Sequence, residues 1–221
     1  TTLKITNIRA GRESPGLKSQ HVAAVRAVGA LCGAEIEGAE VGSTELRFRP
    51  EHLRGGTYAF DVGTAGSIAL VLQAFLPPAV SCGERVEVTV RGGTDVWNAP
   101  TVTYFERVLL PVLRTFGADV KIEVLRRGFF PQGGGEVRVT VEPGGSVKPL
   151  APSGGQPRFL IEGEVACSRL PQDVTDRTRR AIARRLQGLA LGEVRVDLVE
   201  AAGEGVSATL WAPRRCGAVG G

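Results

Sequence analysis

The feature that most constrains the fold of this chain is an order of predicted elements that occurs twice: a strand, a helix and two more strands. Alternating apolar residues predict the strand Leu3–Ile8, and apolar residues at every third position predict the helix Gln20–Cys32, which ends at Gly33. Alternation returns in Ala34–Val41 and Glu45–Arg49, which a Gly-Ser turn joins. These elements form the first block.

The second block is longer, and its last four elements repeat the order of the first. The last helix of each block ends in a Gly-Ala pair, which suggests a repeated module of helices and strands. The first block then lacks an opening strand and helix, so we expect the chain to be truncated at its start. The predicted elements of the second block are the strand Tyr58–Val62, the helix Ala65–Leu76, the strand Glu84–Val90, the helix Val102–Phe116 and the strands Val120–Leu125 and Glu136–Val141.

A change of composition separates a third block from the other two. Pro143–Pro157 is rich in proline, glycine and serine, as linkers are. Beyond it we predict a strand, a helix whose outer faces carry five arginines, and two more strands. No further helix or strand is expected after Trp211, so we expect the chain to be truncated at its end as well. The predicted elements are Phe159–Ala166, Val174–Leu189, Glu193–Val199 and Val206–Trp211.

Composition narrows the class of protein. The 221 residues are 43% hydrophobic and 23% charged, which is typical of a globular chain, and a net charge of +4 is compatible with a polyanionic partner. Four cysteines without a CxxC pair, and two histidines, argue against a zinc site and indicate reduced thiols in a cytosolic protein. The most apolar stretch, Ile68–Val80, contains Gln73 and two prolines and is too short to cross a bilayer.

A basic loop, Asn7–His21, lies between the first strand and the first helix and reads NIRAGRESPGLKSQH. Its arginines, Arg9 and Arg12, stand among glycines and a proline, which let the backbone approach a ligand and stiffen the turn. Guanidinium groups bind phosphate or carboxylate oxygens, and the start of the next helix, with Ser19 as its expected cap, attracts anions. From these residues alone, an anion site and a solvated basic loop are equally open.

A later segment resembles a known family. Arg127–Val137, reading RGFFPQGGGEV, has the signature of the RNA 3'-terminal phosphate cyclases: Arg-Gly, two residues, Pro, one residue, three glycines, one residue and an aliphatic residue. The basic loop, Gly63–Gln73 (GTAGSIALVLQ) and Arg91–Pro100 (RGGTDVWNAP) are similar to further family segments. The similarity runs from Leu3 to Trp211 in family order.

The resemblance implies an α+β fold of repeated βαβαββ units, as in enolpyruvyl transferases, with a smaller inserted α/β domain similar to the C-terminal domain of a translation initiation factor. Residues 1–150 are then the repeat domain, with an incomplete first unit and a complete second unit, and residues 151–221 are the incomplete start of the insert. A glycine-rich segment is implied upstream, and the family's nucleophilic histidine is implied beyond Gly221. Neither His21 nor His52 is that nucleophile, so the chain alone is expected to be inactive.

The activity that the resemblance implies is a ligase reaction. ATP adenylates the enzyme's histidine with release of pyrophosphate, AMP passes to the 3'-phosphate of an RNA, and the ribose 2'-hydroxyl closes a 2',3'-cyclic phosphate. We therefore expect ATP and a divalent metal, Mg²⁺ or Mn²⁺, as cofactors, and RNA with a 3'-phosphate end as partner. No membrane association is expected. The expected location is cytoplasmic, or nuclear in a eukaryote, and the oligomeric state is open.

Four residues around the basic loop match functional positions of the family. Arg9 and Arg12 are implied to hold the RNA 3'-phosphate and the phosphates of ATP, with Gln20 and His21 as further phosphate-binding residues. The alternative is a loop of structural ion pairs.

Two further residues, Gln73 and Pro100, are implied to contact the nucleotide. Gln73 is the only polar side chain of its helix between Ile68 and Leu76, so we expect a buried amide that needs a hydrogen-bond partner, which neighbouring backbone would also satisfy. Pro100 is implied to pack near the adenine, although a proline that heads a helix needs no function.

Other motifs have a structural explanation beside the functional one. The glycines 133–135 are suited to cradle a phosphate, but without a following helix or lysine a tight bend between strands is favoured. Arg91 and Asp95 are similar to family residues and are also ordinary turn residues. For the arginines of Val174–Leu189, a solvated face is favoured over contact with RNA, because no aromatic residues stand among them.

One residue, Thr103, departs from the family, whose members often have an aspartate there. The departure leaves the details of nucleotide contact open and indicates a divergent cyclase or a relative with altered chemistry.

Two other functions compete with the cyclase. A cyclase-like ribosome-biogenesis factor would keep the fold without catalysis, but such relatives tend to lose the paired arginines and the Gln-His pair, which are present here. An enolpyruvyl transferase would use similar repeats, with arginines that bind small phosphorylated acids, and the RGFFPQGGGEV segment argues against it.

Overall fold

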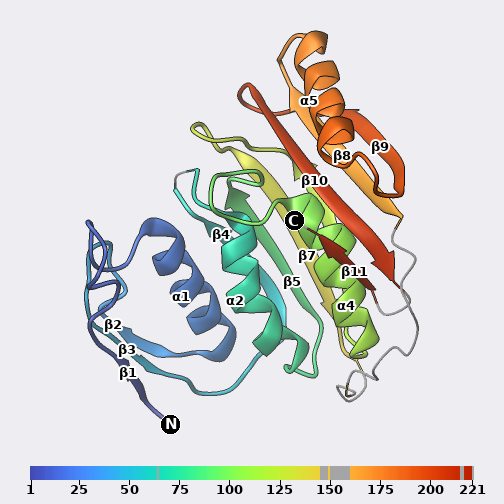
Figure 1. Cartoon of the computed structure of the whole chain (residues 1–221). Helices are drawn as coiled ribbons and strands as arrows, with labels where there is room; N and C mark the ends of the chain where they lie inside the picture. The colour runs from blue at the N-terminus through green and yellow to red at the C-terminus, as the bar shows by residue number, and fades with distance from the viewer. Residues whose placement is uncertain (64, 145–148, 150–159, 215–216, 221) are drawn as a thin grey trace.

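The structure is a computed structural model that describes residues 1–63, 65–144, 149, 160–214 and 217–220, with backbone alone for residues 214 and 217–220. It contains three small sheets, with helices packed on and beside them (Figure 1). This mixture of helices and sheets confirms the predicted α+β class. No helix formed by the described residues is long and apolar enough to cross a membrane.

The first unit consists of β1 (Leu3–Ile5), α1 (Ser19–Cys32), β2 (Glu35–Glu37) and β3 (Leu46–Arg49). Its strands are antiparallel in the order β1-β3-β2. α1 ends where Gly33 takes a left-handed conformation with φ 59°, as the sequence predicts.

The second unit consists of β4 (Gly56–Asp61), α2 (Ile68–Val80), β5 (Val86–Gly92), α3 (Val102–Tyr104), the π-helical turn η1 (Phe105–Leu109), α4 (Leu110–Thr115), β6 (Asp119–Arg126) and β7 (Gly135–Glu142). The strand order is β4-β5-β7-β6, with β4 and β5 parallel and the other pairs antiparallel. The strands β5-β7-β6 therefore have the same order and directions as β1-β3-β2. The repeat seen in the sequence is thus present in the sheet topology.

The core of the second unit lies between its sheet and its helices. Alternate residues of β5 and β7, among them Val88, Val90 and Val139, are fully buried in one cluster with Phe75 and Phe105 of the helices. Burying one such side chain contributes roughly 1.5–3 kcal/mol. The intervening residues of both strands are mostly polar or charged and lie on the opposite face of the sheet.

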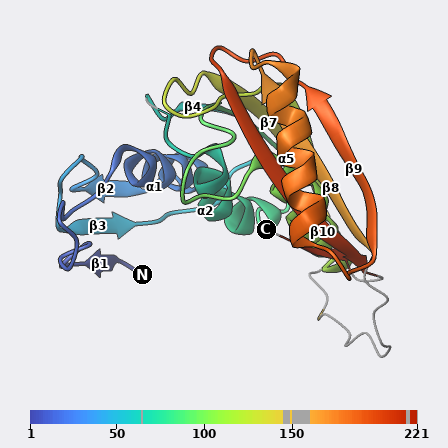
Figure 2. The ribbon, with the colours of Figure 1, turned by 45° about the horizontal axis from the view of Figure 1, so that its top comes forward.

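The third unit consists of β8 (Ile161–Ser168), α5 (Gln172–Arg185), β9 (Leu191–Leu198), β10 (Gly205–Arg214) and β11 (Gly217–Gly220). Its strand order is β11-β10-β8-β9, with β8 and β9 parallel, and α5 packs on β8 and β9 (Figure 2). β10 and β11 contact α3, η1 and α4 of the second unit. The expectation of no closing element after Trp211 is wrong. β11 pairs with β10 through backbone groups, which leave no periodic signal in a glycine-rich segment.

One predicted helix end differs from the structure. α2 does not stop before its prolines but continues through Pro77 and Pro78 to Val80. A proline donates no backbone hydrogen bond, so the carbonyls of Gln73 and Ala74 lose their helical donors. Both of these residues are exposed, so water can bind their carbonyls.

One strand of the first unit is shorter than predicted. β2 stops at Glu37, short of the predicted Val41, because Gly38 turns the chain with φ 79°. The linker predicted at Pro143–Pro157 falls mostly outside the described residues, so the domain division at residue 150 stays a prediction.

Candidate functional site

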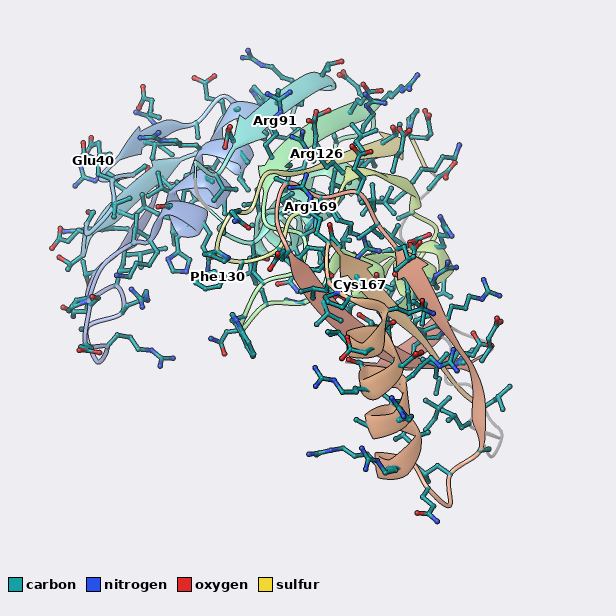
Figure 3. All side chains as sticks on the ribbon, turned by 90° about the horizontal axis from the view of Figure 1, so that it is seen from above. Glu40, Arg91, Arg126, Phe130, Cys167 and Arg169 are labelled. Carbon is teal, nitrogen blue, oxygen red and sulfur yellow. The ribbon has the colours of Figure 1, made fainter. Side chains whose placement is uncertain are left out.

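One end of the molecule collects the carboxyl ends of β4, β5, β6 and β8 and the first residues of the helices. Gln20 bonds to Ser67 there, Ser67 pairs with Gly93, and the N–H of Thr94 donates to the carbonyl of Gly128 (2.8 Å). Helix N-termini are partially positive, and the carboxyl ends of strands commonly bind ligands. We call this end, which Figure 3 views, the upper edge; it comprises the loops 6–18, 65–67, 93–101, 127–134 and 169–171.

The basic loop is folded around Arg9. Its Nη1 donates to the carbonyls of Ser14 (2.8 Å) and Gly16 (2.9 Å). Gly16 has φ 79°, and a Cβ there would lie 2.2 Å from the carbonyl oxygen of Gly42, so only glycine fits. One nitrogen of Arg9 therefore shapes the loop, and its Nε and Nη2 remain for a ligand.

The side chain of Arg12 is exposed and, among the residues that the structure describes, has neither a hydrogen-bond nor an ion-pair partner. Its backbone N–H donates to the carbonyl of Arg9 (3.0 Å), which fixes the turn that carries it. A guanidinium without a partner among the described residues is suited to bind a phosphate.

The first turn of α1 is capped by an imidazole. The prediction of Ser19 as the cap is wrong, because Lys18 is the N-cap residue and Ser19 is already helical. The N–H of Lys18 donates to Nδ1 of His21 (2.9 Å), which requires a neutral ring with its proton on Nε2. His21 therefore closes the helix end, and its Nε2–H is the group left for a ligand.

This cap gives the stability a pH dependence. Burial lowers the pKa of His21 below its ordinary value, and the charges of Arg9 and Lys18 lower that pKa further. Below about pH 6.5 the unfolded chain binds a proton at this ring before the folded chain does. The contribution of His21 is therefore complete above that pH, and stability falls as the pH drops from there through the folded pKa.

An NMR titration of the His52→Gln variant tests this, because His21 is then the only imidazole in the 221 residues. We expect a titration midpoint below 6.5 and a free energy of unfolding that declines with acid from that pH downward. A midpoint above 6.5 would show that the ring is not held neutral.

Gln20 joins the first unit to the second. Its Oε1 accepts from the N–H of Ser67 (3.2 Å), and the Ser67 hydroxyl accepts from the N–H of Leu70 (3.2 Å) as the N-cap of α2. The amide oxygen of Gln20 is thus engaged, and its NH₂ group is the part available to a phosphate. The charge of Arg9 lowers the pKa of His21, and Gln20 precedes His21 in α1, so these three residues lie at the same helix start. A common phosphate site stays a prediction.

The two predicted nucleotide contacts are placed differently. The expectation that Gln73 is buried is wrong: it is exposed on the same face as Pro77, because α2 buries only its side toward α1 and the sheet. Pro100 is half-buried and stands before Thr101, whose hydroxyl caps α3 by accepting from the N–H of Tyr104 (3.1 Å). Contact of either residue with a nucleotide stays a prediction.

A buried ionic network at the upper edge was missed by sequence reasoning. Arg127, with 7% of its side chain exposed, donates from Nη1 to both oxygens of Asp95 (3.2 Å each) and from Nη2 to Glu164 (2.8 Å). Ser207 also donates to Asp95 (2.8 Å). Arg127 and Asp95 belong to the second unit, whereas Glu164 and Ser207 belong to the third. The first residue of the signature segment thus ties the two units together.

Thr103 lies inside this network and is 2% exposed. Its hydroxyl donates to Glu164 (2.7 Å) and accepts from Nη2 of Arg127 (2.9 Å). Arg127 thus binds two carboxylates, that of Asp95 in the second unit and that of Glu164 in the third unit, and position 103 contributes a hydroxyl. The departure from the family at position 103 therefore lies in an internal network.

The network offers no ligands to a metal. Within the described ranges, no buried side-chain nitrogen or oxygen lacks a partner. In the same part of the chain, no three His, Cys, Asp or Glu side chains gather into a metal-binding group. A metal site made of three such protein ligands is therefore not formed by the described residues.

The signature glycines form a bend between β6 and β7. Gly133 and Gly134 have φ 66° and 70°, and the N–H of Gly133 donates to the carbonyl of Phe129 (2.7 Å). A Cβ on Gly128 would lie 2.3 Å from the nitrogen of Gly135, so the two backbones touch and leave no room for side chains. This confirms the interpretation of these glycines as a tight bend.

The other charged residues singled out by the sequence lie on outer surfaces. Arg91 pairs with Glu136 across β5 and β7 (3.2 Å). The arginines of α5 are exposed, and Arg177 pairs with Asp173 (3.6 Å). Surface pairs of this kind contribute little to stability.

Fold and site together define an α+β protein of repeated units whose upper edge presents guanidinium groups beside helix N-termini. Comparison with known proteins adds the family, because the family model described as RNA 3'-terminal phosphate cyclase matches residues 1–212. The chain belongs to this family, as its signature segment predicts.

Similar proteins carry the same description. Proteins named RNA 3'-terminal phosphate cyclase from Nitrosospira multiformis, Ignicoccus hospitalis and Pyrococcus furiosus are 45%, 41% and 40% identical to the chain over 214, 196 and 220 residues. The matches cover 96%, 89% and 99% of this chain but 61%, 56% and 64% of those proteins. The chain thus spans about three fifths of the length of these relatives.

Proposed function

We propose that this chain is part of an ATP-dependent RNA 3'-terminal phosphate cyclase, a ligase that converts the 3'-phosphate of an RNA into a 2',3'-cyclic phosphate. The observation that carries the proposal is the side chain of Arg12, which has no partner among the described residues and stands in a loop that Arg9 shapes and that adjoins Gln20 and His21. Family membership supports it, since the similar proteins are named for this reaction.

The proposed role of this site is to hold phosphates while negative charge moves between them. Phosphoryl transfer depends mostly on positioning and on cations placed where charge accumulates. Arg12 and the free nitrogens of Arg9 are assigned to the RNA 3'-phosphate and the phosphates of ATP. The Nε2–H of His21 and the NH₂ of Gln20 donate to oxygens of the same phosphates. The N-termini of α1 and α2 add to the positive electrostatic potential at the site.

In the proposed sequence, a histidine attacks the α-phosphorus of ATP and pyrophosphate leaves. An oxygen of the RNA 3'-phosphate then takes AMP from the histidine, and the ribose 2'-hydroxyl attacks the RNA phosphorus so that AMP leaves as the ring closes. The attacking histidine is assigned to a segment outside this chain, so residues 1–221 alone are proposed to be inactive. We assign this chemistry to the cytoplasm.

The nucleotide and the metal complete the proposal. Gln73, on the exposed face of α2, and Pro100, ahead of α3, are proposed to contact ATP. A divalent ion, Mg²⁺ or Mn²⁺, would lower the charge of the phosphates. No step is assigned to that ion here, because the described residues do not form its ligand set.

A protein that contains this chain and the downstream histidine should form a covalent adenylate. We expect ATP labelled at the α-phosphate, with Mg²⁺, to leave acid-labile label on a histidine outside residues 1–221, and RNA ending in a 3'-phosphate to release that label as AMP. Residues 1–221 alone are the control and should take up no label. Absence of label in a protein that has the histidine would favour a non-catalytic biogenesis factor.

A further inference from the structure

Two aromatic side chains at the upper edge are far more exposed than other rings of the described residues. Trp97 is 81% exposed and Phe130 is 56% exposed. Both line a groove of about 410 Å³ between the loops 93–101 and 127–134 and the start of β10. Rings this exposed contribute little to the core, and exposed apolar groups that share a groove mark a binding surface.

The fold anchors the backbone beside these rings. Phe129 is 3% exposed and packs on Gly205, where a Cβ would lie 2.1 Å from the ring. Because Phe129 is fixed inward, the ring of the next residue, Phe130, is turned toward solvent. Asn98, with φ 59°, turns the loop directly after Trp97.

The groove lies next to the proposed phosphate site. Gln20 bonds to Ser67, and Ser67 pairs with Gly93, four residues before Trp97. At no more than about 3.6 Å per residue, Trp97 lies within roughly 14 Å of that pair. A short single strand whose end is held near Gln20 can therefore reach the rings.

Cations accompany the rings. Arg126 and Arg169 lie at the same end as Phe130 in Figure 3, are exposed and have no acidic partner among the described residues. The Nε of Arg126 donates to the carbonyl of a signature glycine (2.7 Å), which keeps its guanidinium at the edge. Both arginines lie outside the groove, at the same end of the molecule. A single-stranded nucleic acid stacks its bases on exposed rings and pairs its phosphates with cations farther along the strand.

We propose that Trp97 and Phe130 form a stacking platform for an unpaired base of the RNA, upstream of its 3'-phosphate. This rests on the proposed function, because it takes the molecule held at Arg12 to be RNA. All bases have a π-face, so the platform selects single-stranded ends over paired ones and does not read sequence. The exposed amide of Asn98 is a polar group at the groove that can meet a base edge.

Tryptophan fluorescence tests the platform, because the Trp211→Phe variant of the 221 residues leaves Trp97 as the only indole. The probes are a short single-stranded RNA with a 3'-phosphate, the same length of abasic RNA with a 3'-phosphate, and ATP alone. We expect the base-containing RNA to quench Trp97 and to bind about 5- to 150-fold more tightly than the abasic RNA. Equal binding of the two RNAs, or equal quenching by ATP alone, would overturn the platform.

Variants, followed by anisotropy of labelled RNA, provide the second readout. Trp97→Ala and Phe130→Ala should each weaken the binding of base-containing RNA by a factor within the same roughly 5- to 150-fold range, and neither should change the binding of abasic RNA. Trp97→Phe keeps an aromatic ring and should bind base-containing RNA almost as tightly as the parent chain. Leu198→Ala is the matched control, because Leu198 is 77% exposed on β9, away from the groove, and should change nothing. Unchanged binding in both ring variants would overturn the proposal.

The same series separates this proposal from the function on which it rests. If Arg12→Ala removes the preference for a 3'-phosphate over a 3'-hydroxyl while the ring variants have no effect, the platform fails and the phosphate site stands. If the ring variants weaken binding while 3'-phosphate and 3'-hydroxyl RNA bind equally, the phosphate site fails and the platform stands.

Discussion

Replacing Arg127 by alanine is expected to lower the free energy of unfolding by about 3–5 kcal/mol, because removing one partner of a buried ion pair leaves the other charge unpaired. The Asp95 side chain, 1% exposed, would lose both bonds to the guanidinium, and Glu164 would lose its cation. Urea denaturation of the variant and the parent chain at neutral pH measures the difference.

Arg91→Ala is the matched control, because it removes the same side chain from an exposed pair with Glu136. The Arg91 side chain is 61% exposed, so we expect a change of only about 0–1 kcal/mol. Arg127→Lys should restore part of the loss, since an ammonium keeps the charge but cannot span two carboxylates as the guanidinium fork does. Equal effects of Arg127→Ala and Arg91→Ala would show that the network does not hold the units together.

Replacing Arg12 by alanine is expected to reduce turnover of RNA with a 3'-phosphate by about 10²–10³-fold, the usual cost of removing one donor to a developing charge. The test requires a protein that contains this chain together with the histidine proposed to lie outside it. Because the Arg12 side chain is exposed and unpaired among the described residues, the free energy of unfolding should change by no more than about 0.5 kcal/mol.

Arg49→Ala supplies the control for this loss of charge. Arg49 is an exposed arginine of β3 that pairs with Glu35, so its loss changes the net charge equally without touching the basic loop. We expect its turnover to equal that of the parent protein. If Arg12→Ala had the same turnover as the parent protein, the basic loop would not be a phosphate site and would be only a solvated surface loop.

The local elements could be predicted because their causes lie within a few residues. The alternation in β5 and β7 reflects one buried and one polar face, and the end of α1 at Gly33 reflects the left-handed conformation that glycine accepts. The repeat was visible for the same reason. Two segments of similar pattern fold into the same strand order, β1-β3-β2 and β5-β7-β6.

Contacts between distant residues could not be predicted. Arg127 finds its partners 32 and 37 residues away, and Ser207 lies 112 residues from Asp95. No local pattern in the sequence predicts such pairs. The only signals were the arginine of the signature segment, Arg127, and the aspartate at the end of RGGTD, Asp95. The exposure of Gln73 could not be predicted either, because α2 is apolar nearly throughout and its sequence does not show which face is exposed.

The candidate site was predicted in part. Glycines, a proline and arginines identified the basic loop, and the structure places Arg9, Gln20 and His21 together. The cap was assigned to Ser19 because hydroxyls are the commonest caps, yet the imidazole of His21 reaches the N–H of Lys18 instead. The exposure of Trp97 and Phe130 depends on how the loops fold, which periodicity does not specify.

In the proposed function, the basic loop holds the 3'-phosphate of an RNA while a 2',3'-cyclic phosphate forms. The most direct measurement uses RNA labelled in its 3'-phosphate, incubated with ATP and a protein that contains both this chain and the downstream histidine, and then treated with phosphatase. We expect the label to become resistant to phosphatase, and only when ATP is present. Label that stays fully sensitive in the presence of ATP would contradict the proposed function.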